Sequence, residues 1–270
     1  SPDDLNSHFT LPDLILENVE MMYDVESEVD YAAITDTIAS DGRHSTVVYS
    51  TPAGNITLPE EIYYRYLMMP VNEMEQAAYI NLTTFRKVNS SSDGVFWRSF
   101  LYTANDTGYP VLRDLLLNET TLWNGTRNQV TNNGAVGAVT SWQTRVMEFR
   151  YEDGMRRDHQ PVSLYKQHFG LCGENAEVLA AAAKTALIPT LVTINFDMMH
   201  AWNEFFERGW HQWEGYSGRI DDPSAEGSPG SVTVATNMDP DRSFFTNTDL
   251  YTTTTNLSVN VRDRNGFPVE

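Results

Sequence analysis

The sequence predicts an α+β fold, in which a mainly helical N-terminal region leads into a helix packed on antiparallel strands. The first indication is a pair of helix-start signals, each a threonine, a proline and an acid in fixed spacing, at residues 10–13 and 57–60. The second is an alanine-rich segment followed by β-branched and aromatic stretches. A chain of 270 residues, 41% of them hydrophobic, is long enough to bury such a core.

Residues 1–140 form the predicted helical region. In each start signal the proline occupies the first turn and the acid can accept backbone N–H groups, so an amphipathic helix should follow both. Loops rich in asparagine, glycine and serine separate the remaining apolar segments. We expect further helices at residues 97–103, 111–117 and 139–150.

Residues 141–232 form the predicted core, which changes from helix to strand. The alanine-rich helix over residues 177–187 stops at Ile188-Pro189, because proline cannot continue a helix. Strands are expected at residues 190–196, 200–206 and 210–216, and residues 221–230, rich in proline, glycine and serine, should be a linker or surface loop.

The turn Glu207-Arg208-Gly209 predicts a hairpin, with Gly209 supplying the left-handed conformation. A three-residue loop sets Phe206 opposite Trp210 and Trp202 opposite Glu214, which places His200 and Glu214 diagonally on one face. A two-residue loop would put them on opposite faces. The register therefore decides whether these two side chains can meet.

Residues 233–270 form a predicted β-rich tail, with strands at 231–235 and 256–262. Leu257, Val259 and Val261 alternate with polar residues, and Asn265-Gly266 is a hairpin-turn signal. This pattern is typical of the first strand of a sandwich, so the tail is expected to be the start of a downstream domain, either immunoglobulin-like or similar to a carboxypeptidase regulatory domain.

One ordered motif carries chemistry. It begins with Gly170-Leu171-Cys172-Gly173-Glu174 at a helix start and continues through Ile188-Pro189 and a strand to His200-Ala201-Trp202-Asn203-Glu204. Trp210 follows, with Glu214 four residues later. This order resembles the core of the transglutaminase-like superfamily, which shares a Cys-His-acid arrangement with papain-like cysteine proteases. The resemblance implies a papain-type core and acyl transfer or hydrolysis on carboxamide or peptide substrates through a cysteine thioester.

The residues themselves fit that chemistry. The helix dipole and a neighbouring imidazolium favour the thiolate of a cysteine such as Cys172. His200 can take up the proton as general base and return it to the leaving group as general acid. Glu214 would hold the ring, at a position where the family usually has aspartate.

Other candidates surround this triad. The Cys172 backbone N–H is the expected first oxyanion donor, and Gln160 or Gln167 could supply the second. Trp202 could line the cleft or simply pack. Cys172, His200 and Glu214 could also bind zinc, but no CxxC or HExxH spacing supports this, so we expect neither a metal nor an organic cofactor.

A protein or peptide is the expected substrate. The competing interpretation is a surface interaction module that has kept the fold and lost turnover, and the exchange of aspartate for Glu214 supports it. Fast alkylation of Cys172 would separate the two.

Charge and sequons bound the setting. The net charge of −19 disfavours nucleic acid, and no apolar run is long enough for membrane insertion. Seven N-x-[ST] sequons, about twice the number expected by chance, predict a glycosylated extracellular or cell-surface protein. The sequons begin at Asn55, Asn81, Asn89, Asn105, Asn118, Asn124 and Asn256.

Overall fold

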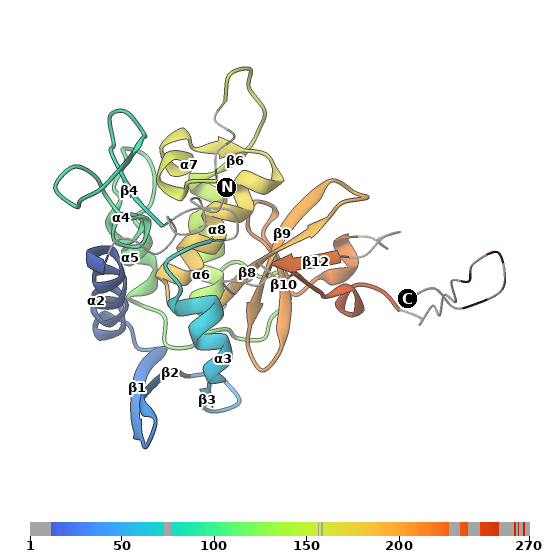
Figure 1. Cartoon of the computed structure of the whole chain (residues 1–270), viewed down its shortest axis with the longest axis horizontal. Coiled ribbons are helices and arrows are strands. Elements are labelled where there is room, and N and C mark those ends of the chain that lie inside the picture. The colour runs from blue at the N-terminus through green and yellow to red at the C-terminus, as the bar shows by residue number, and fades with distance from the viewer. Residues whose placement is uncertain are drawn as a thin grey trace.

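The computed structural model describes residues 12–72, 77–155, 157, 159–226, 233–236, 244–253, 262, 264 and 267. A layer of helices packs against a six-stranded sheet, which has the order β11-β10-β9-β8-β12-β13 (Figure 1). All neighbouring strands of this sheet are antiparallel. The predicted α+β class, with a cysteine-bearing helix on an antiparallel sheet, is confirmed.

The predicted strands form the centre of the sheet. Its members are β8 (Thr190–Asn195), β9 (His200–Phe206), β10 (Trp210–Glu214), β11 (Arg219–Ile220), β12 (Thr233–Thr236) and β13 (Phe244–Thr246). Phe206 pairs with Trp210, so the three-residue hairpin loop is confirmed. The left-handed residue of this turn is Arg208, with φ of 60°, rather than the predicted Gly209.

Helix α8 (Cys172–Thr185) is the central helix, and its first turn contains the motif cysteine. Alanines 180–183 are fully buried, and their small side chains allow the helix to pack closely against β8 and β9. The chain leaves the helix through Leu187 at φ of 56°, and the amide of Ile188 donates to the carbonyl of Ala183. The predicted helix end at Ile188-Pro189 is confirmed.

Helices dominate the N-terminal region and cover one side of the sheet (Figure 1). They are α2 (Pro12–Glu28), α3 (Glu60–Tyr63) with the π-helix η2 (Tyr64–Met68), α4 (Trp97–Thr103), α5 (Leu112–Leu116), α6 (Gly134–Val146) and α7 (Pro161–Gln167). Helix α4 has the predicted bounds, whereas α6 lies earlier than the predicted residues 139–150. It begins at Gly134, which has φ of +69°, and a Cβ there would lie 2.6 Å from the carbonyl oxygen of Thr121.

A small sheet within this region was not predicted. β1 (Ala32–Ala39) and β2 (Gly42–Tyr49) form a hairpin, and β3 (Ile56–Thr57) pairs with β2. The turn at Asp41-Gly42 and the β-branched residues on both sides are ordinary hairpin signals. Thr57 therefore lies in a strand, and Pro59 is the N-cap of α3 without a side-chain hydrogen bond, so the second helix-start signal is wrong in its capping.

The remaining short elements join these parts. They are β4 (Tyr79–Ile80), β5 (Lys87–Val88), β6 (Glu148–Phe149), β7 (Phe169–Gly170) and the 3-10 helices η3 (Gly215–Ser217), η4 (Pro223–Glu226) and η5 (Thr248–Leu250). η4 lies in the segment predicted to be a linker or surface loop, yet Glu226 is buried. That expectation is therefore wrong for Glu226, whereas Ser224 in the same turn is exposed.

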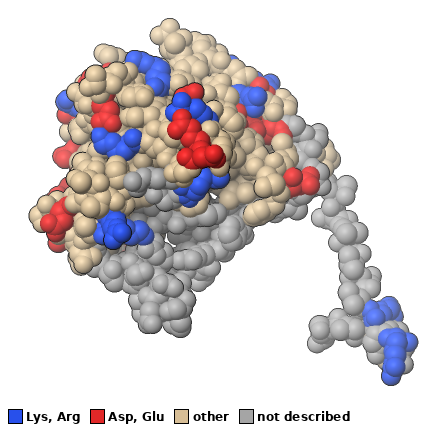
Figure 2. Space-filling view, turned by 90° about the horizontal axis from the view of Figure 1, so that it is seen from above, with Lys and Arg blue, Asp and Glu red and all other residues tan. Residues whose placement is uncertain are grey.

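The predicted tail contributes to the same sheet, because β12 pairs with β8 across the predicted boundary after residue 232. The expected strand at 256–262 and the turn at Asn265-Gly266 lie almost entirely outside the described residues. Within the described part of the chain, no helix has the length and apolar character needed to cross a bilayer. On the face shown in Figure 2, acidic and basic side chains lie beside one another among uncharged residues.

Candidate active site

The N-terminus of α8 positions Cys172. β7 pairs in parallel with β6, and Gly170 at its end leads directly into the helix. A Cβ on Gly170 would lie 2.5 Å from Cβ of Glu174, so only glycine fits before this helix turn. Glu174 in turn accepts a hydrogen bond from the Leu171 amide at 3.0 Å. This backbone arrangement sets the Gly173 amide of the first helix turn beside the sulfur.

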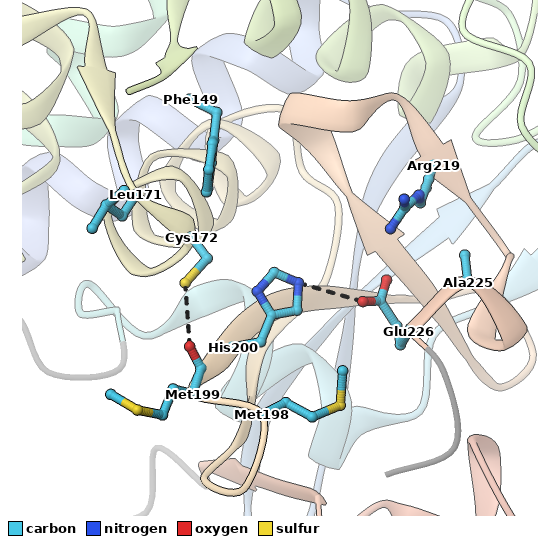
Figure 3. Close-up of a pocket in the computed structure, with 9 residues that line it drawn as sticks. All are labelled: Phe149, Leu171, Cys172, Met198, Met199, His200, Arg219, Ala225 and Glu226. Atoms are coloured by element: carbon cyan, nitrogen blue, oxygen red, sulfur yellow. Dashed lines mark hydrogen bonds and ion pairs between the residues drawn. The ribbon is translucent and has the colours of Figure 1, made fainter. Parts of the chain in front are cut away.

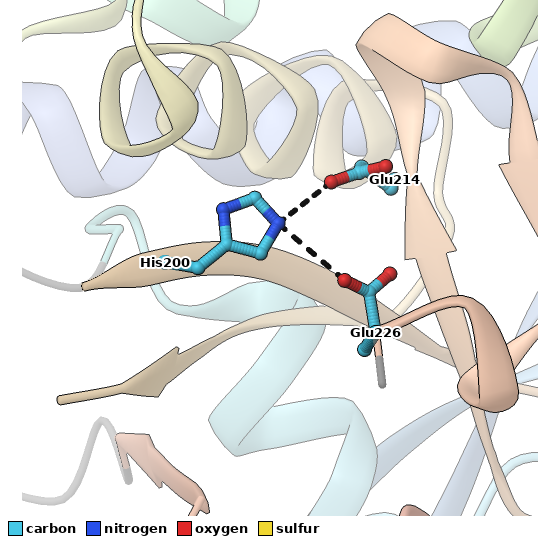
Figure 4. A group of neighbouring side chains, drawn as sticks. All are labelled: His200, Glu214 and Glu226. Atoms are coloured by element: carbon cyan, nitrogen blue, oxygen red, sulfur yellow. Dashed lines mark hydrogen bonds and ion pairs between the residues drawn. The ribbon is translucent and has the colours of Figure 1, made fainter. Parts of the chain in front are cut away.

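The hairpin β9–β10 brings His200 and Glu214 together. His200 begins β9 and Glu214 ends β10, and the observed register places both on one face. His200 Nε2 lies 2.8 Å from Glu214 Oε1 (Figure 4). The diagonal contact predicted from strand parity is therefore present.

Cys172 faces His200 across the mouth of a cavity (Figure 3). Burial of the thiol raises its pKa, but hydrogen bonds from His200 and from the Ala201 and Gly173 amides outweigh burial, so the pKa of Cys172 is lowered. The Cys172 Sγ also lies 3.9 Å from the Met199 carbonyl oxygen, to which the protonated thiol can donate. The surroundings thus favour thiolate over thiol.

His200 is the matching cation. Burial lowers the pKa of its imidazole, but contacts with Cys172, Glu214 and Glu226 raise it to about 11. The ring also lies against Trp202, with centroids 5.5 Å apart. Together the two shifts favour an imidazolium paired with a thiolate.

Glu214 is held from three sides. Its Oε2 accepts hydrogen bonds from the Ser217 hydroxyl and from Arg219 Nη1, the latter at 3.0 Å. Burial raises the pKa of this carboxyl, but the bonds from His200, Ser217 and Tyr216 outweigh burial and lower it. Glu214 therefore lies within hydrogen-bond reach of the histidine as a carboxylate.

A second carboxylate at this site was missed. Glu226 Oε2 lies 3.4 Å from the same His200 Nε2, and Glu226 Oε1 accepts a hydrogen bond from Gln212. The motif offers one acid as the partner of the histidine, Glu214, and the composition of residues 221–230 indicates a loop, so no sequence signal points to Glu226. The side chain reaches the site through the tertiary fold.

The three oxyanion and cleft candidates do not line the cavity, although Trp202 packs against the His200 ring. Gln160 is the N-cap of α7, where its side-chain oxygen accepts the Val162 amide, and Gln167 donates to the carbonyl of Phe169. Trp202 is buried and donates to the Tyr251 hydroxyl at 2.6 Å. None of the three is among the residues that line the cavity at Cys172.

Metal-ligand spacing occurs at this site, but with a different set from the one considered for zinc. Ligand atoms of His200, Glu214 and Glu226 all lie within 4.8 Å of one another, without Cys172. The two carboxylates already accept hydrogen bonds from Ser217 and Gln212. His200, Glu214 and Glu226 are thus joined in one hydrogen-bonded network, to which Ser217 and Gln212 also belong.

The cavity has a volume of about 450 Å³, and its walls are largely apolar. Met199 is 86% exposed, and Phe149 and Met198 are also exposed although their side chains are large and hydrophobic. The cavity is lined by Phe149, Leu171, Cys172, Met198, Met199, His200, Arg219, Ala225 and Glu226 (Figure 3). The Cys172 thiol therefore lies in an open, apolar cavity with charged groups on one side.

The predicted glycosylation asparagines lie mostly at the surface. Exposed positions are Asn55, Asn89, Asn105, Asn118 and Asn124. Asn81 is half-buried and hydrogen-bonds the Asp93 carbonyl, and Asn256 is outside the described residues.

Comparison with known proteins identifies the segment that carries this site. Residues 120–214 match the family described as the transglutaminase-like superfamily. No curated protein matches the chain. A solved structure of a candidate cysteine protease from Cytophaga hutchinsonii is 11% identical, with 87% of this chain and 80% of that chain covered, at a TM-score of 0.27. At this TM-score the likeness supports no inference about activity.

Proposed function

We propose that this protein, whose residues 120–214 match the model of the transglutaminase-like superfamily, is a thiol enzyme that transfers or hydrolyses acyl groups through a Cys172 thioester. The observation that carries the proposal is the line of contacts from Cys172 through His200 to Glu214. The family alone offers a range of reactions, so the proposed roles rest on this geometry.

The proposed reaction has two steps. The Cys172 thiolate attacks a carboxamide or peptide carbonyl, and the His200 imidazolium gives its proton to the leaving nitrogen as the C–N bond breaks. Water or an amine then attacks the thioester, His200 takes up the proton of that nucleophile, and the thiolate leaves. The amide of Cys172 at the helix N-terminus would stabilise the tetrahedral oxyanion.

The cavity walls suggest a protein or peptide with an apolar side chain beside the reacting carbonyl. Phe149 stacks on Tyr216 with ring centroids 4.6 Å apart, and Met199 carries an exposed thioether next to the nucleophile. Such surfaces gain free energy by covering apolar substrate groups. The proposal also includes a glycosylated protein that acts outside the cell, which the exposed sequon asparagines support.

The first test is the reactivity of Cys172 toward iodoacetamide at pH 6–7. The wild type should alkylate faster than a free-cysteine peptide, because its thiolate persists below the usual pKa of about 8.5. His200→Ala should remove this advantage. Labelling of the wild type at the peptide's rate would favour the interaction module instead.

Turnover is then measured with a peptide library that contains glutamine side chains and backbone amides, with and without a primary amine. Incorporation of the amine would identify transfer, and cleavage or ammonia release without incorporation would identify hydrolysis. Cys172→Ala is the matched control, which should keep the fold and lose all product.

A further inference from the structure

We propose that Glu226 is a second positioning carboxylate for His200, sharing the ring nitrogen Nε2 with Glu214. This inference rests on the proposed function, because Glu226 would position His200, the general base of the proposed reaction. The two acids reach the ring from different elements, Glu214 from the end of β10 and Glu226 from η4 (Figure 4).

The distances define an unequal pair of contacts. Glu214 Oε1 lies 2.8 Å from Nε2 and Glu226 Oε2 lies 3.4 Å from it. Nε2 carries one proton, so Glu214 accepts the main hydrogen bond and Glu226 acts mainly through its charge. Both carboxylates are 1–2% exposed, so water screens this charge weakly.

Glu226 is fixed in place by groups other than substrate. Gln212 Nε2 donates to Glu226 Oε1, and Gln212 Oε1 accepts the Asp222 amide at 3.0 Å. One amide side chain on β10 therefore fastens both ends of the short segment 222–226. With one oxygen on Gln212 and the other on His200, Glu226 is placed to act on the histidine rather than to bind a substrate cation.

The charges around the ring show why a second acid matters. Cys172 faces His200 from α8, and Arg219 neutralises the far oxygen of Glu214 from β11. Tyr216 hydrogen-bonds Glu214, and Tyr251, which follows η5, interacts electrostatically with Glu226. Because Arg219 compensates part of the charge of Glu214, Glu226 supplies negative charge that keeps the imidazolium protonated beside the thiolate.

The test compares Glu226→Gln, Glu214→Gln and the double variant in the full chain. His200 titration is followed by NMR of the imidazole nitrogens, and the pH profile of Cys172 alkylation is measured alongside. Glu226→Gln should lower the pKa of His200 by about one unit, and the double variant should lower it further than either single change. The change in alkylation rate at the alkaline end of the pH profile should shift to lower pH together with the pKa of His200.

A merely structural role for Glu226 would give a different result. The melting temperature would fall while the His200 titration stayed in place, and this result would overturn the proposal. Asp221→Asn is the matched control. It also removes one acid close to η4, but Asp221 pairs with His211 at 3.0 Å and not with His200. This control should leave the pKa of His200 unchanged. Glu226→Asp, which keeps the negative charge, should lower that pKa less than Glu226→Gln does.

The two proposals fail separately. If Cys172 labels slowly but Glu226→Gln still lowers the pKa of His200, the thiol-enzyme function fails and the role of Glu226 stands. If Cys172 labels fast and His200 has the same pKa in the wild type and in Glu226→Gln, the function stands and Glu226 is not a positioning residue.

Discussion

Helix α8 meets different environments at its two ends. At the N-terminus Cys172 borders an open cavity and Glu174 caps the first turn. At the C-terminus Arg98 and the side chain of Lys184 are fully enclosed. Anions at the start and cations at the end both match the helix dipole, but only one end is accessible to a substrate.

The enclosed end satisfies its polar groups within the protein. Arg98 donates to the carbonyls of Lys184 and Leu67 and to the Asn18 side chain, and Lys184 donates to the Val71 carbonyl at 3.0 Å. These bonds tie α2, η2 and α4 to the end of the central helix. At the other end the sulfur borders the cavity. The comparison teaches that the same dipole can serve stability at one end and reactivity at the other.

The largest expected effect is the loss of the enclosed end. Arg98→Met fills similar space but removes three buried hydrogen bonds, to the Asn18 side chain and to the Leu67 and Lys184 carbonyls, of which the Lys184 carbonyl still accepts the Leu187 amide. A buried acceptor that loses its donor costs about 1–3 kcal/mol. We expect the free energy of unfolding to fall by about 3–5 kcal/mol, measured by urea denaturation at pH 7.

The control for this change is Arg113→Met. Arg113 forms an exposed ion pair with Glu28 at 2.7 Å, and such pairs contribute about 0–1 kcal/mol. Equal losses in the two variants would mean that the enclosed end has no special role. In the folded fraction of Arg98→Met, Cys172 should still alkylate as in the wild type, because the reactive end is separate.

A buried acid behind the reactive end should give the next largest effect. Glu204 on β9 is fully buried, and burial raises the pKa of its carboxyl to about 7 although Tyr251, Thr193 and Asn247 donate to it. Because the folded pKa lies above the usual value, the contribution to stability is fully present below pH 4.5 and is lost as pH rises through 7. The loss should amount to about 3 kcal/mol by pH 9.

Glu204→Gln checks this sign. The variant should lose less stability than the wild type between pH 5 and pH 9, with thermal unfolding as the measurement. A wild type whose stability is flat over that range would contradict the shift. This pH dependence of stability also bears on the reactive end of α8. Tyr251 hydrogen-bonds both Glu204 and Trp202, and Trp202 packs against the ring of His200.

The reactive end could largely be predicted from the sequence, whereas the enclosed end could not. Cys172, His200 and Glu214 lie on elements whose local pattern is strong, and the hairpin register follows from one turn of three residues. Arg98 gave no such signal, because an arginine on a short helix is ordinarily expected at the surface. Its burial depends on carbonyls from segments far away in sequence.

Glu226 shows the same limit within the site. Pro223 and Ser224 are typical of a surface loop, and the inward turn of the next residues depends on Gln212 from a neighbouring strand. The β1–β2 hairpin is a different case, because Asp41-Gly42 between β-branched stretches was a usable local signal. Local patterns thus predict elements and register, but tertiary contacts decide which polar loop residues become buried.

The smallest expected effect tests whether two anions compete for the start of α8. Glu174 caps the helix and pairs with Arg157, and Cys172 lies in the same first turn. Glu174→Gln keeps an acceptor for the Leu171 amide but removes a negative charge near the thiolate, so stability should fall by about 1 kcal/mol while the pKa of Cys172 falls by less than about one unit. Arg157→Gln, which removes the compensating cation, should move the thiol pKa in the opposite direction. The pH profile of iodoacetamide labelling measures both shifts, and shifts of the same sign would show that packing rather than charge controls this end of the helix.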